Sequence, residues 1–461
     1  MPRGGRRAPW NSAGMNEAGQ QGVWRRRAAR AVTALLAVYA IAVAVKIAVQ
    51  IDRFQVNFQP YYYAALAFNQ GQNPYDSEVT HALAGGRFVL PYAYPPLSLN
   101  LLRPFALAGY ETSYRCFLAL KCAALVLCLW LWQRKFLGRG VDNVFLFVCL
   151  IGFNYAIYWD IHAGNISFLA QTVLWLGLYA YVRGRLGWFI VLTAGASIFK
   201  YTPGFFLVLL LLVEGRKKWG WCAAGGAVFV LLHGASYVLY PELMPEFLKN
   251  IGEIQGLVPV EAATVENFAG APATWPLIKT LITRLSAKLA IPAPSALPVL
   301  VFAGVALTVC GITWVTVRRY PCSEPGERNR MLVVFACLVY LLLTPRLMVG
   351  EYAVGLLPAY YIIRRMRYVN ASLLLVALMI PAPITGRSPG FKFLIETCTN
   401  YYPLLTVYAI WALGVYAHWT MHSDPCDGPG LTGRALERPE DAARGCSDPH
   451  RESSAGRMSR V

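Results

Sequence analysis

Residues 187–213 read GWFIVLTAGASIFKYTPGFFLVLLLLV, an apolar run with a lysine and a proline near its middle. Arg185 precedes the run and Arg216 follows it. Basic residues that flank membrane segments gather on the cytoplasmic side, so both ends of the run are expected there. Pro203 interrupts helical hydrogen bonding and divides the run into arms of about 13 residues, each about 20 Å long. The run therefore predicts a re-entrant hairpin or two short helices.

Apolar stretches recur along nearly the whole chain. Its 461 residues are 56% hydrophobic and 14% charged, whereas about a quarter of the residues in soluble domains are charged. Helices satisfy their own backbone groups in lipid, which favours helical spans for these stretches. We therefore predict an all-α polytopic membrane protein, a bundle of about 11–12 membrane helices with extracytoplasmic loops and re-entrant or broken helices.

The formal net charge of +18 does not by itself indicate a nucleic-acid partner. Basic clusters such as Arg25 to Arg27 and Arg364 to Arg367 adjoin apolar segments, and the alternation of segments places them on one side. The charge therefore indicates topology, with cytoplasmic N- and C-termini and no nucleic-acid binding. Most of the eleven cysteines lie in apolar runs and none forms a CxxC pair, so no metal site and no cofactor are expected.

The chain divides into three parts by composition. Residues 1–30 form a basic tail, 31–420 form the transmembrane domain, and 421–461 form a tail with almost no aromatic residues that is expected to be disordered. The first apolar run, about 31–50, is too long for the core of a signal peptide and is expected to remain as an anchor. Both tails are predicted to be cytoplasmic.

The loop after the first helix, residues 51–112, combines carboxylates with aromatic side chains. Residues 58–68 predict a short helix at the membrane interface. A carboxylate beside an apolar wall can have a raised pKa and act as a general base. The alternative is a solvated loop with aromatic anchors, and spacing alone favours that alternative. The candidates in this loop are Asp52, Asn57, Tyr62, Tyr75 and Asp76.

Three later points also carry polar groups between apolar runs. Lys200 could hold a lipid-linked phosphate, or it could extend from a helix end to the interface. Arg346 could bind a phosphate with two hydrogen bonds while Glu351 orients or deprotonates a hydroxyl, or the two could form a structural ion pair. Asn165 ends a short polar connection that begins at Asp160 and is more simply interpreted as a capped turn.

The order of these motifs resembles glycosyltransferase family 87, a branch of the GT-C membrane fold that includes bacterial α-mannosyltransferases. Residues 57–76, NFQPYYYAALAFNQGQNPYD, are similar to the first-loop signature of that family, and YPPL at 94–97 is similar to its next landmark. Gly164-Asn165, Lys200-x-x-Pro203 and Pro345-Arg346 with Glu351 follow in the family's order. The resemblance covers roughly residues 50–365.

The resemblance implies roles for individual residues. Asn57 stands where the family has its catalytic Asp, and an amide cannot accept the proton. The implied catalytic carboxylates are therefore Asp52 and Glu351, unless the protein has lost this chemistry. The implied substrate-binding residues are Asn57, Tyr62, Tyr75, Asp76, Tyr94, Asn165, Lys200 and Arg346.

The reaction that the resemblance implies is hexose transfer, with mannose favoured, from a polyprenyl-phosphate sugar to a hydroxyl of a glycan or glycolipid acceptor. It would take place on the extracytoplasmic face of a bacterial inner membrane, with inversion at the anomeric carbon and without a metal. Two alternatives remain. A transporter or lipid flippase also contains broken helices, although it usually shows matching interruptions in paired repeats, and a non-catalytic relative would bind the lipid sugar without turnover.

Overall fold

The computed structural model describes scattered positions between 30 and 49, and then the ranges 56–138, 142–254, 272–290, 294–319, 325–364, 366, 368–379 and 400–420. The predicted first helix lies mostly outside the described residues, and the tails 1–30 and 421–461 lie outside them apart from Arg30. Met1–His418 form one unit, which holds nearly all of the described residues, and Trp419–Val461 form another.

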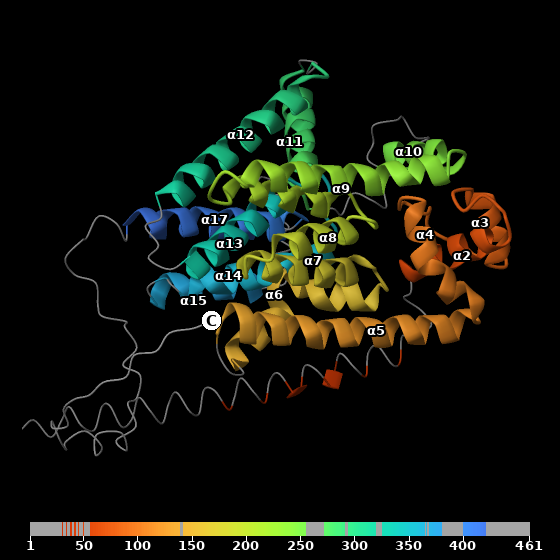
Figure 1. Cartoon of the computed structure of the whole chain (residues 1–461), viewed down its shortest axis with the longest axis horizontal. Coiled ribbons are helices and arrows are strands. Elements are labelled where there is room, and N and C mark those ends of the chain that lie inside the picture. Colours follow the sequence, from red (N-terminus) through yellow and green to blue (C-terminus); the bar gives the residue numbers. More distant parts are fainter. Residues whose placement is uncertain are drawn as a thin grey trace, which may run out of the picture. The chain divides into compact units, whose positions relative to one another are not determined.

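The described residues form helices joined by turns and irregular segments, and no strand occurs among them. Four helical stretches are long and apolar enough to cross a membrane by themselves, and the chain is an integral membrane protein. They are α5 with its π-helical continuation (Tyr110–Phe136), α6 (Asn143–His162), α9 (Lys218–Leu239) and α12 (Leu297–Arg318). Figure 1 shows α5 and α9 running lengthwise with α6, α7 and α8 between them. The predicted all-α polytopic class is confirmed.

Other predicted segments form shorter helices than a membrane crossing requires. The run 187–213 forms α8 (Leu186–Ala196) and the 3-10 helix η3 (Thr202–Leu212), and an 11-residue α-helix rises only about 16 Å. The predicted break is confirmed. Pro203 lies in the first turn of η3, and Gly204 lets Phe229 of α9 approach, because a Cβ there would clash with the Phe229 ring. The polar segment between the two helices carries Lys200.

The predicted short helix of the first loop is α2 (Phe58–Asn69), but most of its side chains are buried in protein, not exposed at an interface. It packs with α3 (Ser77–Leu83), α4 (Leu97–Leu102), the 3-10 helix η1 (Arg103–Leu107) and α10 (Leu243–Ile254), at one end of the helices in Figure 1. We call their shared core the first-loop cluster. Its largest members are Phe58, Tyr61, Tyr62, Tyr63, Tyr75, Tyr92, Tyr114, Phe117 and Phe247.

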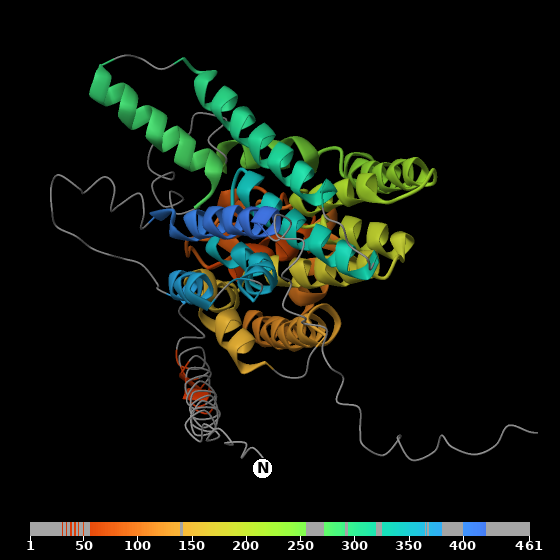
Figure 2. The same cartoon turned by 90° about the vertical axis from the view of Figure 1, so that its left-hand side faces the viewer.

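The main core lies among α5, α6, α8, η3, α12 and six further helices. These are α7 (Ser167–Val182), α13 (Pro325–Leu343), the 3-10 helix η5 (Val349–Gly355), α14 (Leu356–Ile363), α15 (Tyr368–Met379) and α17 (Tyr402–Thr420). The segment 241–295 is expected on the side opposite the basic cluster Arg216–Lys218, because the apolar run of α9 separates the two, and it holds α10 and also α11 (Thr274–Leu289). Figure 2 shows α11 and α12 side by side at the outer edge of the helices.

The turn between α6 and α7 joins the main core to the first-loop cluster. Gly164 has φ +68°, and a Cβ there would lie 2.9 Å from Phe58 Cβ. We expect Gly164→Ala to lower the free energy of unfolding by about 1–3 kcal/mol, because it combines backbone strain with a steric clash. Thermal unfolding in detergent measures the loss. Gly187→Ala is the control, since a Cβ at Gly187 would meet nothing within 4 Å, and equal melting temperatures for the two variants would contradict the prediction.

Candidate functional site

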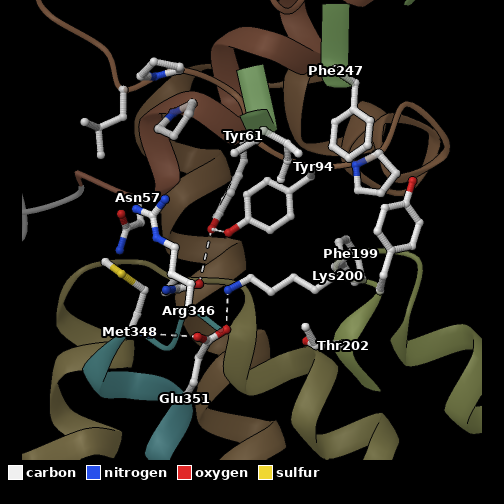
Figure 3. A pocket seen from close by; sticks show the side chains of 18 residues that line it. Asn57, Tyr61, Tyr94, Phe199, Lys200, Thr202, Phe247, Arg346, Met348 and Glu351 are labelled. Atoms are coloured by element: carbon white, nitrogen blue, oxygen red, sulfur yellow. Dashed lines mark hydrogen bonds and ion pairs between the residues drawn. The ribbon is translucent and has the colours of Figure 1, made fainter. Parts of the chain in front are cut away.

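A cavity of about 290 Å³ opens where the first-loop cluster meets the main core (Figure 3). One wall is formed by proline and aromatic side chains of the first loop and α10, and the floor is formed by polar side chains from the ends of core helices. Its lining residues are Asn57, Pro60, Tyr61, Leu90, Pro91, Ala93, Tyr94, Pro95, Asn165, Phe199, Lys200, Tyr201, Thr202, Phe247, Ile251, Arg346, Met348 and Glu351.

Glu351 is the carboxylate of the cavity floor. It lies in η5, which begins after the Pro345 break, and its residue is only 5% exposed. Its Oε1 forms an ion pair with Lys200 Nζ, and its Oε2 accepts a hydrogen bond from the Met348 backbone N–H at 2.8 Å. Gln171 Nε2 donates to the Glu351 carbonyl at 3.3 Å. The carboxylate is therefore held through both oxygens, from two different segments.

Lys200 reaches the floor from the junction between α8 and η3. Its ammonium donates to Ser167 Oγ at 3.2 Å as well as to Glu351, and it lies 6.0 Å from the centre of the Tyr94 ring. The side chain remains 29% exposed. Because an ammonium has three donors, Lys200 can still donate one hydrogen bond into the cavity.

Asn165 connects the floor to the aromatic wall. Its Oδ1 accepts hydrogen bonds from the Ser167 backbone N–H at 3.0 Å and from Tyr61 Oη at 3.3 Å. The hydroxyls of Tyr61 and Tyr94 lie 2.8 Å apart. Burial raises the pKa of both tyrosines, so both side chains are neutral hydroxyls near neutral pH. The wall thus presents uncharged hydrogen-bonding groups beside the charged floor.

Asn57 and Arg346 complete the polar lining. The Asn57 backbone N–H donates to the carbonyl of Ala163 at 2.9 Å, which fixes the start of α2 against the α6–α7 turn. Arg346 follows Pro345 in the segment between α13 and η5 and is partly buried. Figure 3 shows its guanidinium in the cavity together with the ends of Lys200 and Glu351. Two cations and one carboxylate thus share this space.

A second ion pair lies behind the floor. Lys121 Nζ of α5 is 2.6 Å from Asp160 Oδ1 of α6, and both side chains are completely buried. The sequence favours a capped turn for the segment 160–165. Asn165 does accept a hydrogen bond from the following Ser167, but Asp160 pairs with Lys121 instead of capping a helix. Lys121 is not among the candidates predicted from the sequence, although a lysine inside the apolar run of α5 is a signal that could have indicated a functional position.

The structure brings six of the ten candidate residues to the cavity: Asn57, Tyr94, Asn165, Lys200, Arg346 and Glu351. Asp52 lies outside the described residues.

Three candidates lie away from the cavity lining. Tyr62 donates to the Ala108 carbonyl at 3.0 Å, Tyr75 donates to the Tyr94 carbonyl at 2.6 Å, and Asp76 caps α3 through the Glu78 backbone N–H. These contacts join segments of the first loop to one another.

The floor of the cavity combines cations that can bind an anion with a carboxylate that can act as a base. Arg and Lys bind phosphate oxygens through charge-assisted hydrogen bonds, and a carboxylate can accept a proton from a hydroxyl. The prolines and aromatic rings of the wall offer apolar surface and hydroxyls to a ring-shaped polar molecule. Within the described ranges, no three His, Cys, Asp or Glu side chains gather as metal ligands.

A protein family matches a large part of the chain. The family described as Glycosyltransferase family 87 matches residues 92–345, which is more than half of the chain. The match contains Tyr94, Asn165 and Lys200 and ends one residue before Arg346. No curated protein matches the chain.

Proposed function

The chain belongs to glycosyltransferase family 87, and we propose that it transfers a hexose, with mannose favoured, from a polyprenyl-phosphate sugar to an acceptor hydroxyl. The observation that carries the proposal is the single cavity in which Lys200, Arg346 and Glu351 meet beside a proline and aromatic wall. A phosphate donor requires cations, and an acceptor hydroxyl requires a base, so one cavity supplies both parts of the reaction.

The proposed setting is the extracytoplasmic face of a bacterial inner membrane, with cytoplasmic termini. The acceptor is a glycan or glycolipid, and membrane lipids surround the helices. The segments around the cavity support this setting, because α2, α10 and the 90–95 segment belong to the two loops that the distribution of basic residues places on that face. A sugar carried by a lipid would reach the cavity along the membrane surface.

Lys200 and Arg346 bind the donor phosphate in this proposal. As the bond between the anomeric carbon and the phosphate oxygen breaks, the electron pair stays on that oxygen, and the two cations stabilise the added negative charge. The polyprenyl phosphate then leaves as an anion, without help from a metal.

Glu351 is the proposed general base. The acceptor oxygen forms the new bond to the anomeric carbon with inversion at that centre, and the proton of the acceptor passes to the carboxylate. Asp52 is the alternative base, because it lies five residues before the Asn57 position. Only one carboxylate is required for the proton balance.

Donor binding and activation of the base are coupled by geometry. Lys200 Nζ forms an ion pair with Glu351 Oε1. A donor phosphate attracts the same ammonium, and its arrival weakens the hold of Lys200 on the carboxylate. Glu351 thereby becomes more available to a hydroxyl after the donor has bound, which predicts that the acceptor binds second.

The test uses the full chain in lipid vesicles supplied with a panel of radiolabelled polyprenyl-phosphate hexoses and a membrane glycolipid extract. Transfer of label to glycolipid, with mannose preferred, is the expected result. Movement of the intact donor across the bilayer without transfer would identify a flippase, and saturable donor binding without either would identify a non-catalytic relative. Either outcome overturns the proposal.

A further inference from the structure

The geometry points to Lys121 and Asp160 as a positioning pair that sets the Glu351 carboxylate and the Asn165 side chain in the cavity floor. Neither residue lines the cavity, so neither is assigned contact with the substrate. The expected effect on turnover rests on the proposed function, whereas the expected effect on the order of the cavity floor does not.

The first observation is the location of the pair. Both side chains are 0% exposed in the interior of two predicted membrane helices. Replacing such a pair by apolar residues is often neutral or stabilising, so stability alone is a weak reason for placing two charges there. An ordering role accounts better for the pair, because both partners also contact backbone that leads to the cavity.

Lys121 contacts the backbone of Asn165. The ammonium donates to the backbone carbonyls of Asp160 and Asn165, the latter at 2.5 Å. The ammonium also forms an ion pair with the Asp160 carboxylate, at 2.6 Å from Oδ1. Lys121 therefore fixes the turn that holds the Asn165 side chain toward Tyr61 and Ser167.

Asp160 packs against the backbone next to Glu351. A Cβ added at Gly350 would lie 2.8 Å from Asp160 Cβ and 3.2 Å from its Cα. The backbone just before Glu351 therefore packs directly on Asp160, with room only for glycine. Any shift of Asp160 caused by loss of Lys121 is passed to the residue that carries the carboxylate.

Ser167 contacts both Asn165 and Glu351. Its hydroxyl lies 2.9 Å from Asn165 Oδ1 and 3.5 Å from Glu351 Oε1, and it accepts a hydrogen bond from Lys200. One hydroxyl proton can serve only one of the two oxygens. Small displacements of Asn165 thus change whether Ser167 donates to Glu351, which links the buried pair to the state of the carboxylate.

The test compares the wild type with Lys121→Met/Asp160→Asn, which removes both charges and keeps both side chains close to their original size. Thr172→Val is the control, since Thr172 is a buried polar residue on α7 whose hydroxyl bonds to Phe168 and Cys128. We expect the double variant to retain its melting temperature and to bind polyprenyl phosphate within about twofold of the wild type. Its turnover number should fall at least about tenfold, while its KM for the donor stays nearly constant.

A second measurement is amide hydrogen exchange, which needs no activity. Exchange in the segment 160–167 should become faster in the double variant and stay unchanged in η3. Unaltered turnover together with unaltered exchange would overturn the inference, and parallel loss of melting temperature and phosphate binding would reduce the pair to a structural role. If the wild type transfers no sugar, the proposed function fails, and the exchange result alone then decides whether the pair orders the floor.

Discussion

Glu351→Gln is expected to lower the turnover number by about two to four orders of magnitude, the range that general-base catalysis usually contributes. Glutamine has nearly the same shape and can still accept the hydrogen bond from the Met348 backbone N–H, but it cannot take the proton of an acceptor hydroxyl. Donor affinity should be retained, because the substitution releases Lys200 from its ion pair. Initial rates in vesicles at saturating donor, with separate binding of polyprenyl phosphate, measure the two effects.

The matched control is Glu242→Gln, which removes an exposed carboxylate before α10, and its turnover should equal that of the wild type. Asp52→Asn is measured in parallel. If it abolishes transfer while Glu351→Gln does not, Asp52 is the base. If both single variants and their double variant transfer sugar at the parental rate, the proposed chemistry is refuted.

Helix positions can be predicted from the sequence because apolar runs and their polar interruptions are local signals. The apolar runs predict helices near 143–159, 166–182, 297–317 and 403–420, and these agree with α6, α7, α12 and α17 within a few residues. The break near Pro203 is equally accessible, since a proline within an apolar run between two basic clusters leaves few alternatives. The buried position of α2 cannot be predicted in this way, because tyrosine occurs both at membrane interfaces and in packed clusters.

The site can be predicted only where polar residues interrupt an apolar run. Lys200, Arg346 and Glu351 stand at such breaks, and the structure brings them into one cavity. Tyr75 and Asp76 belong to the same motif as Asn57 but lie away from the cavity, because a motif gives proximity along the chain and not the direction of each side chain. The pairing of Lys121 with Asp160 depends on how α5 packs on α6, which no local pattern records.

Lys200→Met is expected to weaken binding of polyprenyl phosphate by about 10- to 100-fold, since a hydrogen bond between charged groups contributes about 1.5–3 kcal/mol. It should also destabilise the fold, because it leaves the Glu351 carboxylate buried without its partner. Removing one member of a buried pair costs about 3–5 kcal/mol, and the partial exposure of Lys200 places the expected loss at the lower end of that range. Lys249→Met is the control, as it removes an exposed cation from α10.

The double variant Lys200→Met/Glu351→Gln separates the two effects. It leaves no unpaired charge at this position, so its melting temperature should return most of the way to that of the wild type. Its phosphate binding and its turnover should remain as poor as in the worse single variant, because neither cation nor base is restored. The stabilities of the four proteins form a double-mutant cycle that isolates the coupling between Lys200 and Glu351. If the double variant regained activity together with stability, the pair would be a structural ion pair, and phosphate binding would have to depend on Arg346 alone.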